Sequence, residues 1–196
     1  MNTDIQTYPK VNSLGRKLIL FAAIVAGFAS MVLLSSCASL YTETANTTVY
    51  LVRHAEKLTG PDAGRNPELS EAGQARTQVL AEILADKGIE HIHSTNYIRT
   101  KSTVTPLATA LGLEIEIYNP RDLPALATAI KEQGGTHLVV GHSNTTQETA
   151  IALGSDTTQP AINEKREYDR LYEVQIFDES IQTKLTRYGE AYTPAE

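Results

Sequence analysis

Cysteine is nearly absent from this sequence: Cys37 is the only one among 196 residues. A single cysteine excludes an intramolecular disulfide, whichever compartment the protein reaches. Basic residues are also few, with 17 Lys and Arg against 23 Asp and Glu. This acidic balance argues against nucleic acid as a partner, because binding to a phosphate backbone needs a basic face.

Several motifs of common enzyme classes are missing too. No glycine-rich P-loop occurs, which argues against nucleotide hydrolysis by that route. Ser143 stands in Gly141-His-Ser-Asn-Thr145, which lacks the Gly-x-Ser-x-Gly pattern of serine hydrolases. His91 and His93 alternate on a predicted strand, but no acidic or cysteine ligand accompanies them in a metal-binding pattern. We therefore expect these two histidines to be packing residues, and we expect neither a bound metal nor a cofactor.

One long apolar run lies near the N-terminus, at residues 18–34. Basic residues precede it, and Leu34-Ser-Ser-Cys37 ends it. A basic segment, an apolar segment and small residues before a cleavage point are typical of a secretory signal peptide. The four residues up to Cys37 also resemble the lipobox of bacterial lipoproteins, in which the cysteine receives lipid and becomes the new N-terminus.

This pattern divides the chain into four parts. Residues 1–36 are the predicted signal peptide, and residues 37–47 are the predicted lipid anchor on Cys37 with a polar tether. Residues 48–190 form the predicted domain, and residues 191–196 a tail. The alternative is an uncleaved anchor, since about 17 apolar residues are the lower limit for crossing a bilayer. Both interpretations predict export, because positive charge stays on the cytoplasmic side. We expect a membrane-anchored lipoprotein on the periplasmic or cell-surface side.

Strand and helix patterns alternate through the predicted domain. Short apolar runs predict strands, and apolar residues at helical spacing between a capping residue and a glycine predict helices. Ser70 and Asp122 are the expected N-caps of two helices, and Pro106 is expected to kink or delay a third. This order indicates a three-layer α/β/α fold with a mostly parallel sheet. The expected strands cover residues 48–52, 89–93, 114–118, 136–140, 171–177 and 183–188, and the expected helices cover residues 70–88, 97–111, 123–132 and 144–153.

Two histidines directly follow predicted strands. His54 comes after the first strand, in Arg53-His54, and His142 comes after the fourth, in Gly141-His142. In an open α/β sheet, ligands bind where loops leave the carboxyl ends of strands. Two imidazoles at such ends, one of them beside an arginine, predict a catalytic site that binds an anion.

Four motifs occur in an order typical of one family. They are Arg53-His54-Ala55, Leu69-Ser-Glu-Ala-Gly73, Ser94-Thr-Asn-Tyr-Ile-Arg99-Thr-Lys-Ser-Thr103 and Gly141-His142. Together they resemble the histidine phosphatase superfamily, also called the phosphoglycerate-mutase-like family, over residues 49–185. The run Glu167-Tyr-Asp-Arg-Leu171 is similar to the entry of the last strands in many bacterial members. The resemblance implies a phosphoglycerate-mutase-like version of the predicted fold.

The resemblance also implies a role for each residue of the predicted anion site. His54 would be phosphorylated, and Arg53, Arg99 and His142 would bind the phosphoryl oxygens, with His142 as a charged donor. Water would then release phosphate from His54. The residue types agree with this chemistry, because arginine stays protonated, binds phosphate oxygens in bidentate fashion and keeps a neighbouring imidazole neutral.

The group that protonates the leaving oxygen has no clear assignment in the sequence. Asp122 lies in the segment where the family supplies a carboxylate, but its expected role as a helix cap explains it. Glu56, close to the nucleophile in sequence, is a further candidate for a direct catalytic role. Lys57 is a candidate for binding an anionic group of the substrate. Without an acid, the enzyme should prefer good leaving groups, as in phosphohistidine, acyl phosphates and aryl phosphates.

Two departures from the family pattern carry expectations of their own. Ala55 replaces the usual glycine after the histidine, which tests whether that position needs a positive φ. Arg76-Thr77 stands where Gln-Ala is common, and we expect this pair on the helix surface, without functional effect.

These observations predict an exported, membrane-tethered and metal-independent phosphatase of the histidine acid type. It would hydrolyse phosphomonoesters or phosphoramidates through a phosphohistidine intermediate on His54. Its expected partners are a small phosphorylated substrate or a phosphoprotein, and the membrane through lipid on Cys37. The alternatives are a phosphomutase of the same fold and a non-catalytic surface module that binds phosphate.

Overall fold

The computed structural model describes residues 45–192. The predicted signal peptide and the lipid attachment at Cys37 lie outside the described residues, as do residues 193–196 of the predicted tail. Among the described residues, no helix is long and apolar enough to cross a membrane. All predicted strands and helices of the domain fall within the described residues.

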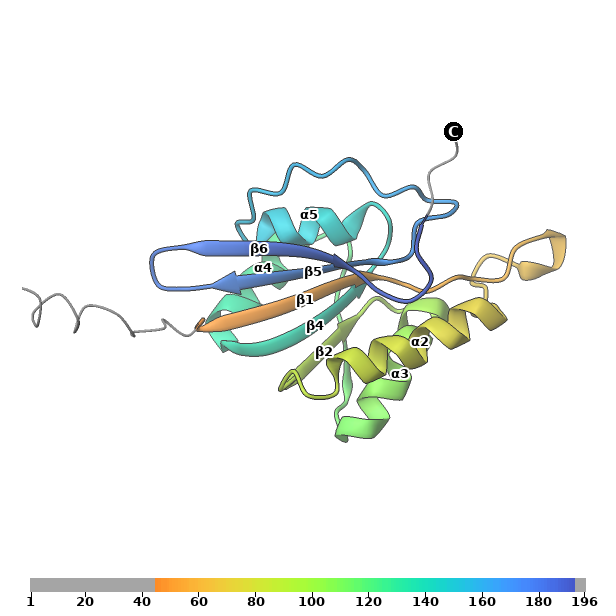
Figure 1. The fold of residues 1–196 in the computed structure, drawn as a ribbon, viewed down its shortest axis with the longest axis horizontal. Coiled ribbons are helices and arrows are strands. Elements are labelled where there is room, and N and C mark those ends of the chain that lie inside the picture. Colours follow the sequence, from red (N-terminus) through yellow and green to blue (C-terminus); the bar gives the residue numbers. More distant parts are fainter. Residues whose placement is uncertain (1–44, 193–196) are drawn as a thin grey trace, which may run out of the picture. The chain divides into compact units, whose positions relative to one another are not determined.

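Six strands form one sheet in the order β3-β2-β4-β1-β5-β6 (Figure 1). The four strands from β3 to β1 are parallel, and β5 and β6 extend the sheet by antiparallel pairing. The prediction of a mostly parallel sheet is therefore confirmed. The strands are β1 Thr47–Arg53, β2 His91–Ser94, β3 Ile115–Ile117, β4 Gly135–Gly141, β5 Arg170–Ile176 and β6 Ile181–Arg187.

Helices cover both faces of this sheet, which confirms the predicted three-layer α/β/α fold (Figure 1). Val52 of β1 packs in a buried cluster with residues of α2 and α3, whereas its neighbour Leu51 packs in a second cluster with residues of α4 and α5. Successive strand residues point to opposite faces, so the two clusters are the two cores of the sheet. The helices are α2 Glu71–Leu84, α3 Ile98–Leu111, α4 Leu123–Gln133 and α5 Thr145–Ala152, with a 3-10 turn η1 Pro61–Ala63 in the loop after β1.

The helix starts follow the capping residues of the sequence. Ser70 accepts a hydrogen bond from the Gly73 N–H at the start of α2, and Asp122 accepts one from the Ala125 N–H at the start of α4. Each cap satisfies a backbone donor that the helix itself leaves without a partner. Both predicted N-caps are therefore confirmed. Gly112 closes α3 with φ 67°, a conformation that glycine adopts without strain.

Some element boundaries differ from the predictions. α2 ends at Leu84, before the expected Gly88, because the Lys87 N–H donates to the Leu84 carbonyl oxygen in a turn (3.1 Å). β2 begins at His91 rather than at residue 89, and β6 begins at Ile181 rather than at residue 183. Pro106 lies inside α3, which excludes the delayed start and leaves the alternative, a kink, as a prediction.

Gly73 lets α2 approach the chain segment that follows β1. A Cβ atom at this position would lie 2.0 Å from the carbonyl oxygen of Glu56. The Ser70 N–H donates to the same oxygen (2.9 Å). The Leu-x-x-x-Gly motif of the sequence thus holds the backbone that comes directly after His54.

Candidate active site

The predicted site residues gather where β1, β2 and β4 end. Arg53 at the end of β1 is opposite Gly141 at the end of β4. His54 and His142 therefore leave neighbouring strands at the same level, and the His54 N–H donates to the Gly141 carbonyl oxygen (3.0 Å). The two imidazole centroids are 5.6 Å apart. Arg99 reaches the same place from the first turn of α3, with its guanidinium 3.4 Å from the His142 ring.

His54 is buried, with 3% of its surface exposed. Its Nδ1 lies 2.8 Å from the Ala55 carbonyl oxygen, which only accepts hydrogen bonds, so Nδ1 carries the proton of the neutral ring. Nε2 then has a free lone pair, as a nitrogen nucleophile requires. Burial, and then the charges of Arg53 and Arg99, lower the pKa of His54 to about 3 despite the opposing bond to Ala55. The ring is therefore neutral at physiological pH.

Ala55 shows that the position after His54 does not need glycine. Among residues 45–192, only glycines have a positive φ. The Ala55 N–H donates to Oγ1 of Thr103, the last residue of the motif that begins at Ser94 (2.9 Å). This bond holds the backbone whose carbonyl group orients the His54 ring.

His142 is oriented by a chain of hydroxyl groups. Its Nδ1 faces Arg99 Nη2 at 3.4 Å, and since arginine only donates, Nδ1 accepts and Nε2 carries the proton. The Nε2–H donates to Thr95 Oγ1 (3.0 Å), which donates to Thr100 Oγ1 (3.0 Å). Burial, and then the charges of Arg99 and Arg53, lower the pKa of His142 to about 4. His142 is thus neutral here, and a role as charged donor requires a bound anion that raises its pKa.

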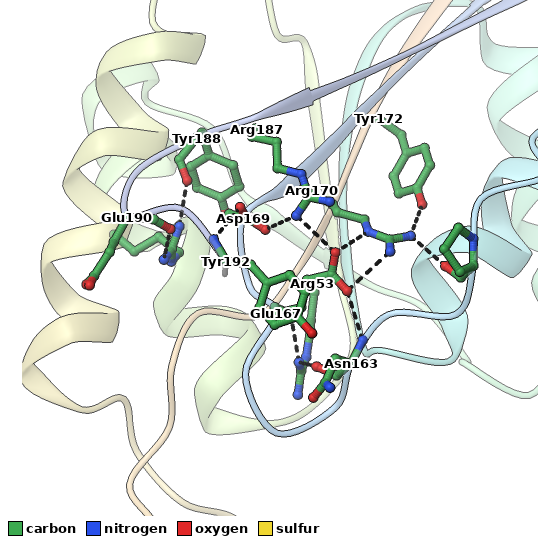
Figure 2. A network of polar contacts seen from close by, with 12 residues as sticks. Arg53, Asn163, Glu167, Asp169, Arg170, Tyr172, Arg187, Tyr188, Glu190 and Tyr192 are labelled. Atoms are coloured by element: carbon green, nitrogen blue, oxygen red, sulfur yellow. Dashed lines mark hydrogen bonds and ion pairs between the residues drawn. The ribbon is translucent and has the colours of Figure 1, made fainter. Parts of the chain in front are cut away.

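In each of the two arginines, one buried donor has no hydrogen-bond partner among the described residues. The terminal nitrogens of Arg53 donate to backbone carbonyl groups in residues 163–167 (Figure 2). The Arg99 guanidinium lies over the Tyr97 ring, 4.5 Å from its centroid. In both arginines Nε is buried and has no hydrogen-bond partner within the part of the chain that the structure describes. Buried cationic donors without partners are costly, so two of them beside two neutral imidazoles indicate a site for an anion.

Two tyrosines that the sequence reasoning left without a role flank these groups. The Arg53 guanidinium lies 4.1 Å from the ring centroid of Tyr168, and that ring is 6.0 Å from His54. The Tyr97 ring meets His142 edge-on at 5.3 Å. Both tyrosines occur inside motifs that were recognised for their charged residues. Each ring contacts a residue far away in the sequence, so these contacts could not be identified from the motifs alone.

The position of Arg76 contradicts its predicted place on the helix surface, and Arg76 also pairs with Glu56, a candidate catalytic residue. Arg76 and Thr77 are buried, so the expectation that they lie on the helix surface is wrong. The segment after β6 covers this part of α2, and Arg76 donates to the carbonyl oxygens of Tyr188 (2.6 Å) and Glu190 (2.9 Å). Both carboxylate oxygens of Glu56 accept hydrogen bonds from Arg76 at 2.8 to 3.0 Å. Glu56 is therefore an ion-pair partner of Arg76, and its direct role in catalysis stays a prediction.

Lys57 lies in the loop after β1. Its backbone pairs with Leu69 in an isolated bridge, and its side chain is partly exposed. Binding of an anionic substrate group by this side chain stays a prediction.

Three further histidines form a separate cluster on β2 and β4. The His137 Nε2–H donates to the Gly134 carbonyl oxygen (2.7 Å), and the His93 Nε2–H donates to His137 Nδ1 (3.0 Å). The His91 ring stacks on His137 with centroids 4.8 Å apart. No group of three or more His, Cys, Asp or Glu side chains in residues 45–192 is arranged to hold a metal ion. His91 and His93 also pair with the Glu116 carboxylate at 3.2 and 3.6 Å, and their role as packing residues stays a prediction.

Comparison with known proteins gives a family for part of the chain and a fold for the domain. Residues 49–120 match the family model of the histidine phosphatase superfamily (branch 1). No curated protein matches the sequence. The 49–120 segment carries Arg53, His54 and Arg99, whereas His142 lies beyond it.

Solved structures with the same fold cover most of this chain. The protein histidine phosphatase SixA complexed with tungstate has a TM-score of 0.58 at 15% identity, covering 72% of this chain and 97% of that chain. The SixA protein of Agrobacterium tumefaciens has a TM-score of 0.56 at 20% identity, covering 74% and 99%. Mycobacterial glucosyl-3-phosphoglycerate phosphatase in complex with VO3 has a TM-score of 0.56 at 14% identity, covering 74% and 100%. The domain therefore has the phosphoglycerate-mutase-like fold, and its segment 49–120 matches the histidine phosphatase superfamily.

Proposed function

We propose that the protein is a phosphatase that transfers a phosphoryl group to His54 Nε2 and then to water. One observation carries the proposal: a neutral, buried imidazole lies among two guanidinium groups whose Nε donors have no partner within the described residues. Phosphoryl transfer needs a positioned nucleophile and neutralisation of the phosphoryl oxygens. The family match and the shared fold with phosphatases bound to tungstate and VO3 support the same reaction.

The reaction has two steps at this site. In the first, His54 Nε2 forms a bond to phosphorus while the bond from phosphorus to the leaving group breaks. Arg53 and Arg99 bind the phosphoryl oxygens, and the phosphoryl charge raises the pKa of His142 so that this ring becomes a charged donor. In the second step, water forms a bond to phosphorus, the nitrogen–phosphorus bond breaks, and inorganic phosphate leaves.

Glu56 and Asp122 are the two candidates for the general acid, and the contacts of their carboxylates bear on the substrate class. Glu56 binds Arg76, and Asp122 caps α4. We therefore propose that the leaving group departs without acid assistance. This is easiest for acyl and aryl phosphates, whose leaving groups are stable anions, and for phosphohistidine whose second ring nitrogen already carries a proton, so that neutral imidazole leaves.

A panel of substrates tests this proposal. With the purified full-length protein, kcat/KM for phosphohistidine and p-nitrophenyl phosphate should exceed that for an alkyl phosphate by about 10²–10⁴, the usual contribution of a general acid. Equal rates on aryl and alkyl phosphates would show that an acid is present. Isomerisation of a phosphosugar without net phosphate release would favour a phosphomutase. Phosphate binding without any turnover would favour a non-catalytic surface module.

We also propose that residues 1–47 export the domain and tether it to a membrane, on the periplasmic or cell-surface side. The support is the signal-peptide pattern that ends at Cys37. In cells fed labelled palmitate, the wild-type protein should carry the label and Cys37→Ser should not. A membrane-bound but unlabelled wild-type protein would favour the uncleaved anchor, and a protein confined to the cytosol would contradict export.

A further inference from the structure

A tight turn at residues 163–167 holds the guanidinium of Arg53. Arg53 Nη1 donates to the carbonyl oxygens of Glu167 (2.9 Å) and Asn163 (3.2 Å), and Nη2 donates to that of Glu164. These bonds fix both terminal nitrogens, and Nε is the buried donor that they leave without a partner in residues 45–192. The direction of the free Nε–H therefore depends on the shape of the turn.

Glu167 closes this turn with both its backbone and its side chain. The Glu167 N–H donates to the Asn163 carbonyl oxygen (2.9 Å), and Glu167 Oε2 accepts a hydrogen bond from the Asn163 N–H (2.9 Å). The carboxylate thus clamps the first residue of the turn to the last. Both of these residues supply carbonyl groups to Arg53.

The Glu167 carboxylate is itself anchored to the β5–β6 hairpin (Figure 2). It is 2% exposed and accepts hydrogen bonds from Arg170 Nε (2.7 Å) and Arg187 Nη1 (2.9 Å). Burial alone would raise the pKa of Glu167, but the bonds from Arg170 and from the Asn163 backbone outweigh it and lower the pKa. A continuous set of contacts therefore runs from the hairpin through Glu167 and the turn to Arg53.

We propose that Glu167 is a positioning residue of the phosphatase: by clamping the 163–167 turn to the β5–β6 hairpin, it aims the Arg53 guanidinium at the phosphoryl group. The inference rests on the proposed function and extends it, because it assigns a catalytic consequence to a residue that touches no substrate. Arg53 is held at its terminal nitrogens by backbone carbonyl groups, so a small displacement of the turn moves the binding donor itself. Misplacement of a binding group by about 1 Å can cost up to about 10²-fold in rate.

Asp169 provides a matched control for Glu167. Its carboxylate is also buried and binds the same Arg187 (2.6 Å), but its second oxygen accepts from the Tyr192 N–H (2.8 Å) and not from the turn. Glu167→Gln and Asp169→Asn each remove one buried negative charge beside Arg187. Only the first changes the clamp on the turn.

The experiment compares the full-length wild-type protein with these two variants. Tungstate affinity is measured by calorimetry, KM and kcat are measured with p-nitrophenyl phosphate, and Tm is measured for each protein. Both variants should lower Tm, because each leaves Arg187 with one carboxylate fewer. Glu167→Gln should weaken tungstate binding and raise KM by about tenfold or more. Asp169→Asn should change both by less than about twofold.

A double-mutant cycle separates positioning from general stabilisation. In an Arg53→Met background the turn has no guanidinium to aim, so adding Glu167→Gln should change tungstate affinity by less than about twofold. If Glu167→Gln does not fold, Arg187→Gln serves instead, because it keeps the Glu167–Arg170 pair. Arg187→Gln should weaken tungstate binding more than Asp169→Asn does.

Each outcome has a defined meaning. Folded Glu167→Gln with wild-type tungstate affinity and KM would overturn the positioning role while leaving the proposed function intact. The same holds if the loss is fully additive in the Arg53→Met background. A wild-type protein that neither binds tungstate nor releases phosphate would overturn the proposed function, and the positioning role with it.

Discussion

Replacing His54 with alanine is expected to lower kcat/KM for p-nitrophenyl phosphate by about 10⁴-fold or more, the scale of losing a catalytic nucleophile. The reason is specific to this site: Nε2 of His54 is the ring nitrogen left with a lone pair once Nδ1 donates to the Ala55 carbonyl oxygen. Arg53 and Arg99 remain in the variant, so tungstate should still bind. Steady-state kinetics and calorimetry on the same preparation measure the two effects.

His91→Ala is the control for this substitution. His91 lies in the separate histidine cluster, so its removal should change kcat/KM by less than about twofold. If His54→Ala kept more than about a tenth of the wild-type kcat/KM, the nucleophile would have to be another group.

Replacing Arg99 with methionine has the second largest expected effect. Arg99 carries one of the two buried Nε donors that have no partner in the described part of the chain, and it faces His142 at 3.4 Å. Removing one donor from a preorganised oxyanion site costs about 10²–10³-fold in kcat. Arg99→Met should therefore lower kcat/KM for aryl phosphates by about this factor. Lys101→Met removes the same charge from the same helix, but the Lys101 side chain donates to Asn96 and not to His142, so this variant should leave kcat/KM nearly unchanged.

The pH profile of this variant gives a second, independent measure. The profile of kcat/KM reports the ionisation of the free enzyme. In the wild-type protein burial lowers the pKa of His54 to about 3 and that of His142 to about 4, with help from the arginine charges. Protonation of His54, the proposed nucleophile, should therefore lower kcat/KM only in strong acid, once the titration of the substrate itself is corrected for. Arg99→Met removes a positive charge, so both pKa values should rise and the acid limb should move to higher pH. If the acid side of the kcat/KM profile did not move in Arg99→Met, the Arg99 charge would not be lowering the histidine pKa values.

The fold was predictable because local sequence patterns indicate the strands and helices of each layer. Apolar runs of strand length alternate with helical spacing, and Ser70 and Asp122 mark helix starts that the structure reproduces. The differences concern boundaries such as the end of α2 at Leu84, where a turn competes with the last helical residues. The spacing of apolar residues does not indicate which of these competing hydrogen bonds forms, so it does not predict where the helix ends.

The site residues were predictable where they directly follow strands or, like Arg99, belong to a family motif. Arg53, His54 and His142 lie at strand ends, so parallel pairing brings them together. The bonds that hold Arg53 come from backbone carbonyl groups more than a hundred positions later in the chain, and a backbone acceptor leaves no trace in residue identity. The Glu56–Arg76 pair was missed for a related reason. It depends on how α2 docks against β1 and on the segment after β6, both of which are long-range contacts.

Trapping the covalent intermediate tests the central claim most directly. The wild-type protein is mixed with phosphorus-32-labelled aryl phosphate, quenched in alkali within milliseconds and digested for peptide mapping, with His54→Ala treated in parallel. We expect an acid-labile, alkali-stable label on the peptide that contains His54, and no label in the variant. Turnover of the wild-type protein with no label on His54, or with the label on another residue, would contradict the account.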